Sequence, residues 1–337
     1  MNAARTSFRK SSGIESAGKF FRLILSACLL GLSLPAQSFD LQGHRGARGL
    51  MPVNTLAAFQ HAMELGVSTL ELDIAITADG IPVISHDPAL NPDLTRDAQG
   101  RWIRGRGPLI QSLTLEQLQA FDVGRTDPDS AYARQFSRQQ ARDGQRIPTL
   151  ASLFKLAKTL GAETVRFDIE TKIFPNRPGD TPGPEVFVNT LLAVIRDAGM
   201  DQRVMIQSFD WRTLQLLRKL APAMDTVYLT SESRNFNNVR DRAWTGGMSW
   251  RDHASTAAMV KASGGTVWSP NFGDIDAVAV KSAQQLGVKV IPWTVNESTD
   301  MDRLIGWGVD GIISDYPDRL RDAMRRATLP LPLGLKN

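Results

Sequence analysis

Residues 58–74, AFQHAMELGVSTLELDI, decide the fold, because a helical pattern there ends at a glycine and a buried strand follows at once. Apolar residues recur three and four positions apart as far as Leu65, which is typical of an amphipathic helix. Gly66 supplies the left-handed residue that often follows a helix, and the apolar run after it is typical of a strand buried on both faces. The same pattern recurs in residues 153–170, 279–295 and 303–317, with its glycine at Gly161, Gly287 and Gly308.

Helices that alternate with buried strands predict a parallel sheet. Strands are expected near 41–44, 69–74, 165–170, 204–207, 226–229, 266–268, 289–293 and 311–313. Helices are expected near 55–65, 149–160, 185–198, 211–220, 253–262, 275–286, 299–305 and 317–326. Eight such units in about 250 residues predict an α/β protein with a TIM (β/α)8 barrel, whose site lies at the carboxyl ends of the strands. The alternative is an open doubly wound sheet, although no glycine-rich dinucleotide fingerprint follows any strand.

The residues beyond that length are concentrated at 88–146, where the apolar periodicity fades and nine arginines occur without a lysine. This segment is interpreted as an insertion in the second βα connection, on the same side as the site. A long structured insertion there usually shapes a pocket. The alternative is a solvated excursion with no role in binding.

Residues 1–38 are interpreted as a secretory signal peptide, with basic residues up to Arg22 and an apolar run from 23 to 34. That run is shorter than the roughly 20 residues of a membrane-spanning helix. The mature chain, beginning at Gln37 or Phe39, is then periplasmic or secreted, and residues 39–337 form a single catalytic barrel domain. The alternatives are an uncleaved anchor, a disordered tail, or a lipoprotein acylated at Cys28.

The net charge of the full chain is +4, and five basic residues and one acidic residue within 1–38 account for all of it. The mature chain is therefore neutral, and it contains no cysteine. A neutral chain lacks the basic footprint of a nucleic-acid-binding protein. An enzyme or a solute-binding protein remains, with no stable membrane insertion after signal cleavage and no indication of oligomeric state.

Three acids lie at predicted strand ends. Glu71 and Asp73 are two residues apart and so project to the same side of their strand, and Glu170 closes the next one. Converging carboxylates without cysteine or histidine ligands favour Ca²⁺ or Mg²⁺ over zinc. Without a cation they would repel one another strongly. The alternative is a surface strand with acids on its solvent face.

Two of the four histidines, His44 and His86, also follow predicted strand ends. Imidazoles beside a metal can act as general base and general acid, because they titrate near neutrality. Arg45 and Lys172 adjoin these candidates, and both suit an anionic substrate. For Arg45 and for Lys172, the alternative is an ordinary salt bridge.

These segments resemble bacterial glycerophosphodiester phosphodiesterases, particularly the exported ones. The matching motifs are HRGARGLMPVNTLAAF (44–59), TLELDIAITADGIPVISHD (69–87), DIETK (168–172), WTVN (293–296) and GVDGIISDYP (308–317). The resemblance implies a TIM-barrel hydrolase that cleaves small glycerophosphodiesters, such as glycerophosphocholine or glycerophosphoethanolamine, to sn-glycerol 3-phosphate and an alcohol.

The resemblance also implies roles for single residues. His44 and His86 would form the acid–base pair. Glu71, Asp73 and Glu170 would bind one divalent cation, Ca²⁺ or Mg²⁺. Arg45 and Lys172 would contact the phosphate, and Trp293 would line the wall near the glycerol group.

One position departs from the family's usual PENT motif, because Val53 replaces the acid that is thought to hold the HRG arginine. Arg45 is then less firmly placed, or another acid compensates. Two other functions are considered. One is a lysophospholipase D or a phospholipase C-like enzyme on intact lipids, which an apolar rim near the site would favour. The other is a non-catalytic glycerophosphodiester-binding protein, which the presence of both histidines disfavours.

Overall fold

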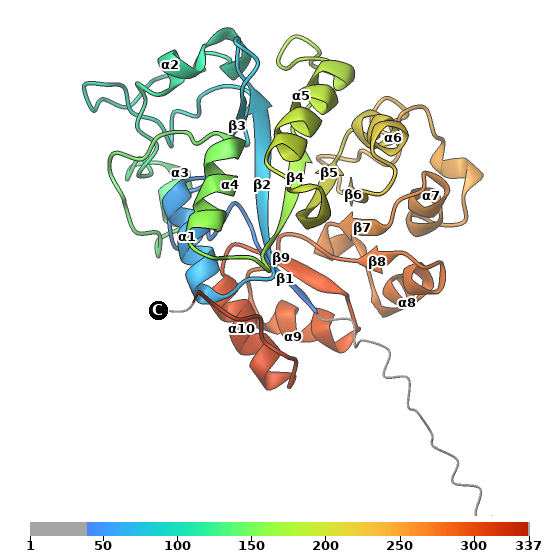
Figure 1. Cartoon of the computed structure of the whole chain (residues 1–337). Coiled ribbons are helices and arrows are strands. Elements are labelled where there is room, and N and C mark those ends of the chain that lie inside the picture. The colour runs from blue at the N-terminus through green and yellow to red at the C-terminus, as the bar shows by residue number, and fades with distance from the viewer. Residues whose placement is uncertain (1–38, 336–337) are drawn as a thin grey trace, which may run out of the picture. The chain divides into compact units, whose positions relative to one another are not determined.

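The computed structural model of the protein describes residues 39–335, in which parallel strands are surrounded by helices (Figure 1). The strands in this part of the chain are β1 (Asp40–Gly43), β2 (Thr69–Ile76), β3 (Pro82–Ile84), β4 (Arg166–Thr171), β5 (Val204–Ser208), β6 (Asp225–Thr230), β7 (Val267–Pro270), β8 (Lys289–Val290) and β9 (Gly311–Ser314). The predicted signal peptide and Cys28 lie outside the described residues.

Eight of these strands pair in the order β8-β7-β6-β5-β4-β2-β1-β9, and every pair along this path is parallel. At the seam, the Asp310 N–H donates to the Val290 carbonyl at 2.9 Å, and the Ile313 N–H donates to the Pro292 carbonyl at 3.0 Å. Backbone hydrogen bonds therefore join the two end strands, and the predicted barrel is confirmed. No open sheet is present among residues 39–335.

A helix follows each strand of the barrel. These helices are α1 (Leu56–Leu65), α4 (Leu150–Thr159), α5 (Pro184–Asp197), α6 (Trp211–Leu220), α7 (Thr256–Ala262), α8 (Ala277–Gln285), α9 (Ser298–Gly306) and α10 (Pro317–Arg326). All eight predicted helices are confirmed, and their bounds agree with the prediction to within a few residues. Gly66, Gly161, Gly287 and Gly308 all have positive φ, between 65° and 85°, as the repeated pattern requires.

Strand β8 ends at Val290, whereas the sequence predicts a strand up to Trp293. The reason is Pro292, which has no N–H to donate to a neighbouring strand. The chain nevertheless continues beside β7, because the Ile291 N–H donates to the Trp268 carbonyl and the Trp293 N–H to the Pro270 carbonyl, both at 3.0 Å.

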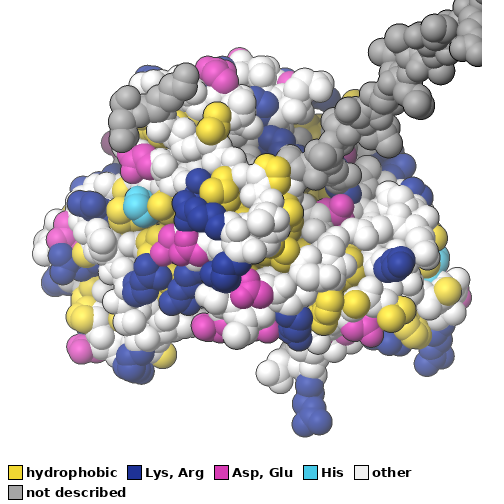
Figure 2. Space-filling model, turned by 90° about the horizontal axis from the view of Figure 1, so that it is seen from below, with side chains coloured by type: hydrophobic (Ala, Val, Ile, Leu, Met, Phe, Trp, Pro, Cys, Tyr) yellow, Lys and Arg dark blue, Asp and Glu magenta, His cyan; other side chains and the backbone are white. Residues whose placement is uncertain are grey.

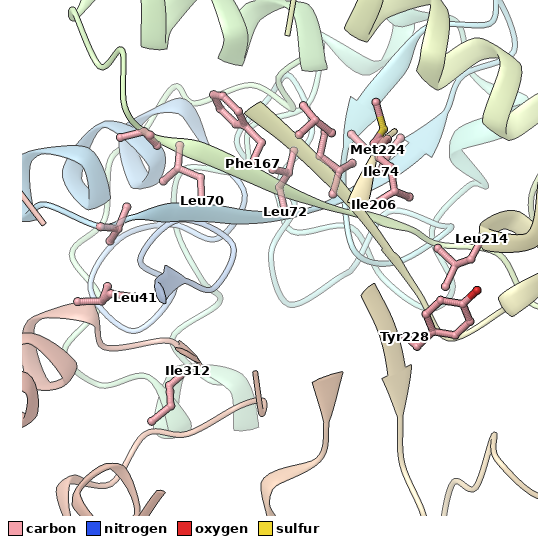
Figure 3. Close-up of a cluster of buried hydrophobic side chains, with 14 of the residues drawn as sticks. Leu41, Leu70, Leu72, Ile74, Phe167, Ile206, Leu214, Met224, Tyr228 and Ile312 are labelled. Atoms are coloured by element: carbon pink, nitrogen blue, oxygen red, sulfur yellow. The ribbon is translucent and has the colours of Figure 1, made fainter. Parts of the chain in front are cut away.

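The two faces of the strands bury different residues. On the outer face, apolar side chains such as Leu70, Leu72 and Phe167 pack toward the helices, as Figure 3 shows. Inside the barrel, a separate apolar cluster comes from the later strands and the segment after β8, and it consists of Met205, Val227, Val267, Ile291 and Ile313. The interior positions of β1, β2 and β4 are instead polar or acidic, which leaves room for a site.

The predicted insertion, 88–146, carries two short helices, α2 (Leu115–Leu118) and α3 (Ala131–Gln135). Strand β3 lies antiparallel to β2, with Ile84 opposite Ile74, so the chain turns back at Asp79-Gly80 as predicted. A second apolar cluster joins the insertion to this hairpin through Ala75, Val83, Leu90, Ile110, Leu118 and Ile147.

Most insertion arginines form ion pairs with nearby acids. Arg96 contacts Asp122 and Asp143, and Arg138 contacts Asp318 beyond the insertion. Both signs of charge are interspersed with hydrophobic side chains over the face shown in Figure 2. None of the helices built from residues 39–335 is long and apolar enough to cross a bilayer.

Candidate active site

The loop after β1 adopts an unusual backbone conformation that places two side chains in the site. Arg45 and Asn54 have φ values of 52° and 57°, and Thr328 is the only other non-glycine residue with positive φ among residues 39–335. Both side chains contact the same atom, because Arg45 Nε lies 3.1 Å from Asp73 Oδ2 and Asn54 Nδ2 donates to it at 3.0 Å. Such backbone strain is concentrated at functional sites, where the surroundings hold it in place.

Glu71, Asp73 and Glu170 converge as predicted. One oxygen of each lies within 4.8 Å of the others, and all three residues are buried. The sheet explains this geometry, because the β2–β4 register places Asp73 beside Glu170. The acids form no solvent face of a surface strand, so that alternative is wrong.

Each carboxylate has a cationic or amide partner. Glu71 accepts hydrogen bonds from the Arg45 backbone N–H at 2.9 Å and from Gln207 Nε2 at 2.7 Å. Lys172 Nζ lies 2.8 Å from Glu170 Oε1 and 3.8 Å from Asp73 Oδ1. Arg45 is thus held by Asp73, although Val53 replaces the family's usual acid.

The three acids differ in their tendency to ionise. Burial, reinforced by Asp73, raises the pKa of Glu71 well above its usual range. Burial also raises the pKa of Glu170 to about 7, against the effect of Lys172. Burial disfavours the Asp73 anion as well, yet the positive charges of Arg45 and Lys172 hold the pKa of Asp73 below its usual range. The triad therefore lacks enough positive charge to ionise fully by itself.

The residues present fit a divalent cation. Asp73 Oδ1 is buried and accepts no hydrogen bond from any described residue, so this oxygen can serve as a ligand atom without losing a hydrogen bond. Three carboxylates against Arg45 and Lys172 leave one negative charge, and a divalent cation would turn this into one positive charge. That balance suits a phosphodiester, which carries a single negative charge. All three side chains offer oxygen, the ligand that Ca²⁺ and Mg²⁺ prefer.

His44 is fixed by an acid from the last strand. Its Nδ1 lies 2.6 Å from Asp315 Oδ1, and its Nε2 lies 3.7 Å from Glu71 Oε2. Arg48 donates to both oxygens of Asp315, at 2.6 and 2.8 Å. An Nδ1–H bonded to Asp315 leaves Nε2 unprotonated and directed to the triad. Burial, helped by Arg48, lowers the pKa of His44 to about 3, so the ring is neutral near pH 7.

His86 stands at a more open position. About 36% of its side chain is exposed, and its Nδ1 lies 2.9 Å from Asp87 Oδ1. Asn91 donates to the other oxygen of Asp87 at 2.7 Å. Partial desolvation of the ring by the surrounding protein, together with the positive charge of Arg45, lowers the pKa of His86 to about 4.

The two histidines, the two cationic residues and two of the three acids line one cavity of about 210 Å³, here named the catalytic cavity. It is lined by His44, Arg45, Arg48, Glu71, His86, Glu170, Lys172, Gln207, Phe209, Leu229, Trp293, Thr294 and Ile313. Trp293 and Phe209 pack edge to face at 5.3 Å on one wall, and the Trp293 indole N–H donates to the Ser269 carbonyl at 2.9 Å. Seven of the eight predicted site residues thus line this cavity, and the eighth, Asp73, lies against Arg45 and within 4.8 Å of an oxygen of each other acid.

Sequence reasoning missed four residues of this site: Asn54, Gln207, Asp315 and Arg48. Gln207 and Asp315 follow the same rule as the predicted acids, because each lies at the carboxyl end of a strand or just beyond it. Asp315 even falls inside the quoted GVDGIISDYP motif. Arg48 and Asn54 carry no comparable signal, because a loop conformation brings them to the acids.

Comparison with known proteins gives the family. Residues 44–319 match the glycerophosphoryl diester phosphodiesterase family. The chain belongs to this family. The resemblance drawn from the sequence motifs is therefore confirmed at the level of the family.

Individual relatives extend over nearly the same length. A glycerophosphodiester phosphodiesterase of Caldanaerobacter subterraneus is 31% identical over 285 residues, which are 84% of this chain and 96% of that protein. The crystal structure of a Silicibacter pomeroyi protein assigned as a glycerophosphoryl diester phosphodiesterase is 34% identical. It superposes with a TM-score of 0.79 over 87% of this chain and 95% of the other.

A more distant structure shares the fold. It is an Oleispira antarctica phosphodiesterase in complex with the product sn-glycerol-3-phosphate, and its TM-score is 0.61 at 23% identity. The alignment covers 85% of this chain and 96% of the other.

Proposed function

We propose that this protein hydrolyses small glycerophosphodiesters to sn-glycerol 3-phosphate and an alcohol. The observation that carries the proposal is the buried triad of Glu71, Asp73 and Glu170 beside a cavity lined by two imidazoles, in a chain of the phosphodiesterase family. Both histidines and all three acids are present, which supports catalysis and not mere binding.

The triad holds one divalent cation, Ca²⁺ or Mg²⁺, in this proposal. When bound, the cation supplies charge that offsets the negative charge developing on phosphorus and on the attacking oxygen. The protein's part is to keep the three carboxylates together. The Arg45 backbone N–H, Gln207 and Asn54 do this by hydrogen bonds to Glu71 and Asp73.

His44 acts as the general base in the proposed reaction. Its neutral Nε2 takes the proton of the attacking hydroxyl, while Asp315 holds Nδ1–H and stabilises the imidazolium that forms. His86 takes part in its imidazolium form, with Nδ1–H held by Asp87 and a second proton on Nε2, and the negative charge of a bound phosphodiester favours this form. It donates the Nε2 proton to the departing alkoxide as the phosphorus–oxygen bond to the alcohol breaks.

If the attacking hydroxyl is a water, its oxygen forms the new bond to phosphorus as the bond to the alcohol breaks, and the two histidines then exchange one proton with solvent. If it is the glycerol 2-hydroxyl, a cyclic phosphate forms, and a water then opens it while His86 takes the water's proton and His44 returns its proton to the 2-oxygen. Either route consumes one water.

Arg45 and Lys172 bind the phosphate, and Trp293 borders the glycerol group. Both cationic residues line the catalytic cavity beside the triad, and the cavity's aromatic wall of Trp293 and Phe209 offers an apolar surface for the carbon chain of glycerol. Lys172 Nζ lies 5.9 Å from the centre of the Phe209 ring, so the two walls of the cavity meet there.

The surface supports a small diester over an intact lipid. The large hydrophobic side chains that are exposed among residues 39–335 are Val186, Leu220, Val278, Leu286 and Leu333. They lie on α5, α6, α8, just after α8 and in the C-terminal tail, and none of them lines the catalytic cavity. These five residues therefore supply no apolar rim to the catalytic cavity of the kind that would favour a lysophospholipase D.

We also propose that the protein is exported, on the composition of residues 1–38. The protein purified from the periplasm or medium is expected to begin at Gln37 or Phe39 by intact-mass analysis. A mass that includes an acylated Cys28 would identify a lipoprotein instead, and an unprocessed N-terminus would contradict export by signal cleavage.

The activity is tested with the purified mature protein and glycerophosphodiesters that carry different headgroups. Glycerol 3-phosphate is measured with added Ca²⁺ or Mg²⁺ and with EDTA. Release of glycerol 3-phosphate that depends on the cation is expected for at least one substrate. Absence of release from every common headgroup, with either cation, would refute the proposed function.

A further inference from the structure

A second cavity, of about 280 Å³, lies beside the catalytic cavity and is named the insertion cavity here. The linings of the two cavities share Arg45, Arg48 and His86. Arg45 and His86 have proposed roles, whereas Arg48 has none. Its side chain is only 13% exposed, and it contacts Asp315, just after β9, and Phe136 of the insertion.

The Arg48 guanidinium fixes the Asp315 carboxylate. Its Nε donates to Oδ1 at 2.6 Å, and its Nη2 donates to Oδ2 at 2.8 Å. Such a two-point pair sets the plane of a carboxylate as well as its position. Asn296 Nδ2 also donates to Oδ2, at 2.7 Å, and the Asp315 side chain is fully buried. The carboxylate therefore cannot turn without breaking several hydrogen bonds.

This carboxylate in turn orients His44. The Asp315 oxygen that accepts from Arg48 Nε also lies 2.6 Å from His44 Nδ1. The bond at Nδ1 determines where the other ring nitrogen, Nε2, points. A carboxylate displaced by about 1 Å would therefore misplace the nitrogen that takes the proton, and such an error can lower a rate about 10²-fold.

The insertion holds the side chain of Arg48. The guanidinium carbon, Cζ, lies 4.6 Å from the centre of the Phe136 ring, within the range of a cation–π contact. Phe136 directly follows α3 and is itself only 3% exposed. The Tyr132 ring packs against it, with the two ring centres 4.7 Å apart. The guanidinium thus lies between a buried carboxylate and a fixed aromatic ring.

The insertion also holds the backbone of the loop that carries Arg48. Gln139 Nε2 donates to the Arg48 carbonyl at 2.8 Å, and the Gln140 N–H donates to the Leu50 carbonyl at 2.8 Å. Residues 132–140, named the clamp segment here, therefore contact Arg48 at both its guanidinium and its carbonyl.

We infer that the insertion positions the general base through Arg48, which the clamp segment holds and which fixes Asp315 beside His44. This inference rests on the proposed function, in which His44 is that base. Phe136 and Gln139 line neither cavity, so they are positioning residues that do not touch a substrate there. The competing role for Arg48, which lines both cavities, is direct binding of the phosphate.

The first experiment measures kcat and KM of Arg48→Met at saturating divalent cation. The substrate is whichever of glycerophosphocholine and glycerophosphoethanolamine the wild-type protein cleaves faster. We expect kcat to fall about tenfold to 100-fold, as for other groups that orient a catalytic residue, and KM to change little. A raised KM with unchanged kcat would assign Arg48 to phosphate binding and overturn the inference.

Arg96→Met is the matched control for this experiment. Arg96 also pairs with a carboxylate, Asp122, and its Cζ lies 5.7 Å from the centre of an aromatic ring, Trp102. It belongs to the insertion but lines neither cavity. The kcat of Arg96→Met should therefore equal the wild-type value, which separates the effect on the base from a general disturbance of the insertion.

A second experiment tests whether Arg48 acts through Asp315. In an Asp315→Ala background no carboxylate remains for Arg48 to orient, so adding Arg48→Met should change kcat by less than about twofold. The double variant leaves neither charge buried without its partner, which favours its folding. Effects of the two substitutions that multiply in full would show that Arg48 acts independently of Asp315, and would overturn the inference.

Variants of the clamp segment test the part that the insertion plays. Phe136→Leu keeps an apolar side chain but removes the ring beside Arg48, and kcat is expected to fall about threefold to tenfold with KM unchanged. Gln139→Met removes the donor to the Arg48 carbonyl and should lower kcat about twofold to tenfold. Melting temperatures show which variants are folded in the assay, so Gln139→Met decides the matter if Phe136→Leu does not fold.

The outcomes separate the two claims. If wild-type protein with a divalent cation cleaves no glycerophosphodiester, the proposed function fails. If it cleaves them, and folded variants of the clamp segment keep the wild-type kcat, the function stands and the inference about the insertion is overturned.

Discussion

The two halves of the barrel interior differ in chemistry. Strands β1, β2 and β4 direct Gln42, Glu71, Asp73, Asp168 and Glu170 inward. The later strands and the segment after β8 fill the other half with Met205, Val227, Val267, Ile291 and Ile313. Both halves have the same backbone, so the side chains alone determine which half supports chemistry.

The acidic half is itself divided along the strands. Glu71 and Asp73 lie beside Arg45, Lys172 and a cavity that a substrate can enter. Asp168, opposite Glu71 in the sheet register, lies deeper. Burial, reinforced by Asp40, raises the pKa of Asp168 well above its usual range, which favours the protonated form of this acid. Near the site, positive side chains therefore compensate the buried acids. Deeper in the barrel, the buried acid is shifted toward its protonated form instead.

The largest expected effect is a loss of catalysis when either histidine beside the acidic half is removed. His44→Ala and His86→Ala should each lower kcat at least about 10²-fold, the low end of acid–base contributions. His61→Ala is a matched control, because that ring lies on α1 beside Glu64, outside both cavities. If His44→Ala or His86→Ala keeps a rate near wild type, the catalytic role of that histidine is refuted.

The apolar half should respond in stability and not in catalysis. Met205→Ala removes a buried side chain from the interior cluster and should destabilise the fold by about 2–5 kcal/mol. Chemical denaturation measures this loss. At a temperature where the variant is folded, its kcat/KM should equal the wild-type value, and a large loss of activity would show that the two halves are not independent.

Asp315 acts through His44 and is a positioning residue. Asp315→Asn should lower kcat by about tenfold to 100-fold, as for other partners that orient a catalytic group. KM should change little, because Asp315 does not line either cavity. A rise in KM with unchanged kcat would place Asp315 in substrate binding instead.

The smallest expected effect is a pH-dependent change in stability at Asp168. Between the ordinary pKa of an aspartate and the raised folded value, the unfolded chain loses its proton and the folded protein keeps it, so stability falls as pH rises. Each pKa unit of difference corresponds to about 1.4 kcal/mol. Asp168→Asn cannot ionise, and its melting temperature should therefore rise relative to wild type as the pH is raised above about 4, the ordinary pKa of an aspartate. A constant difference across this range would show that Asp168 is ionised in the fold.

The fold and the core of the site could be predicted from periodic features of the sequence. Glu71 and Asp73 follow from the two-residue repeat of a strand, and Gly66 marks the end of a helix. Contacts between distant segments carry no such signal. His44 and Asp315 are 271 residues apart, and the positive φ of Arg45, which places its side chain beside Asp73, depends on the folded loop.

The composition of the insertion likewise fails to show which of its residues lie near the site. Its arginines attract attention as possible ligands for phosphate, yet neither cavity beside the site is lined by any of them. Arg125, for example, pairs with Asp143. The insertion residues that line a cavity together with His86 include Leu90, Leu94 and Val123, which look unremarkable in the sequence, because their position next to His86 is a property of the fold.

The central claim is that the acidic half of the barrel interior holds a divalent cation that the reaction needs. Calorimetric titration of Ca²⁺ and Mg²⁺ into metal-stripped protein, with turnover measured on the same samples, tests it most directly. One cation site should fill as activity returns, and Asp73→Asn, which keeps the shape but removes a charge, should lose both. Full turnover by the metal-stripped protein, or unchanged cation binding in Asp73→Asn, would contradict the claim.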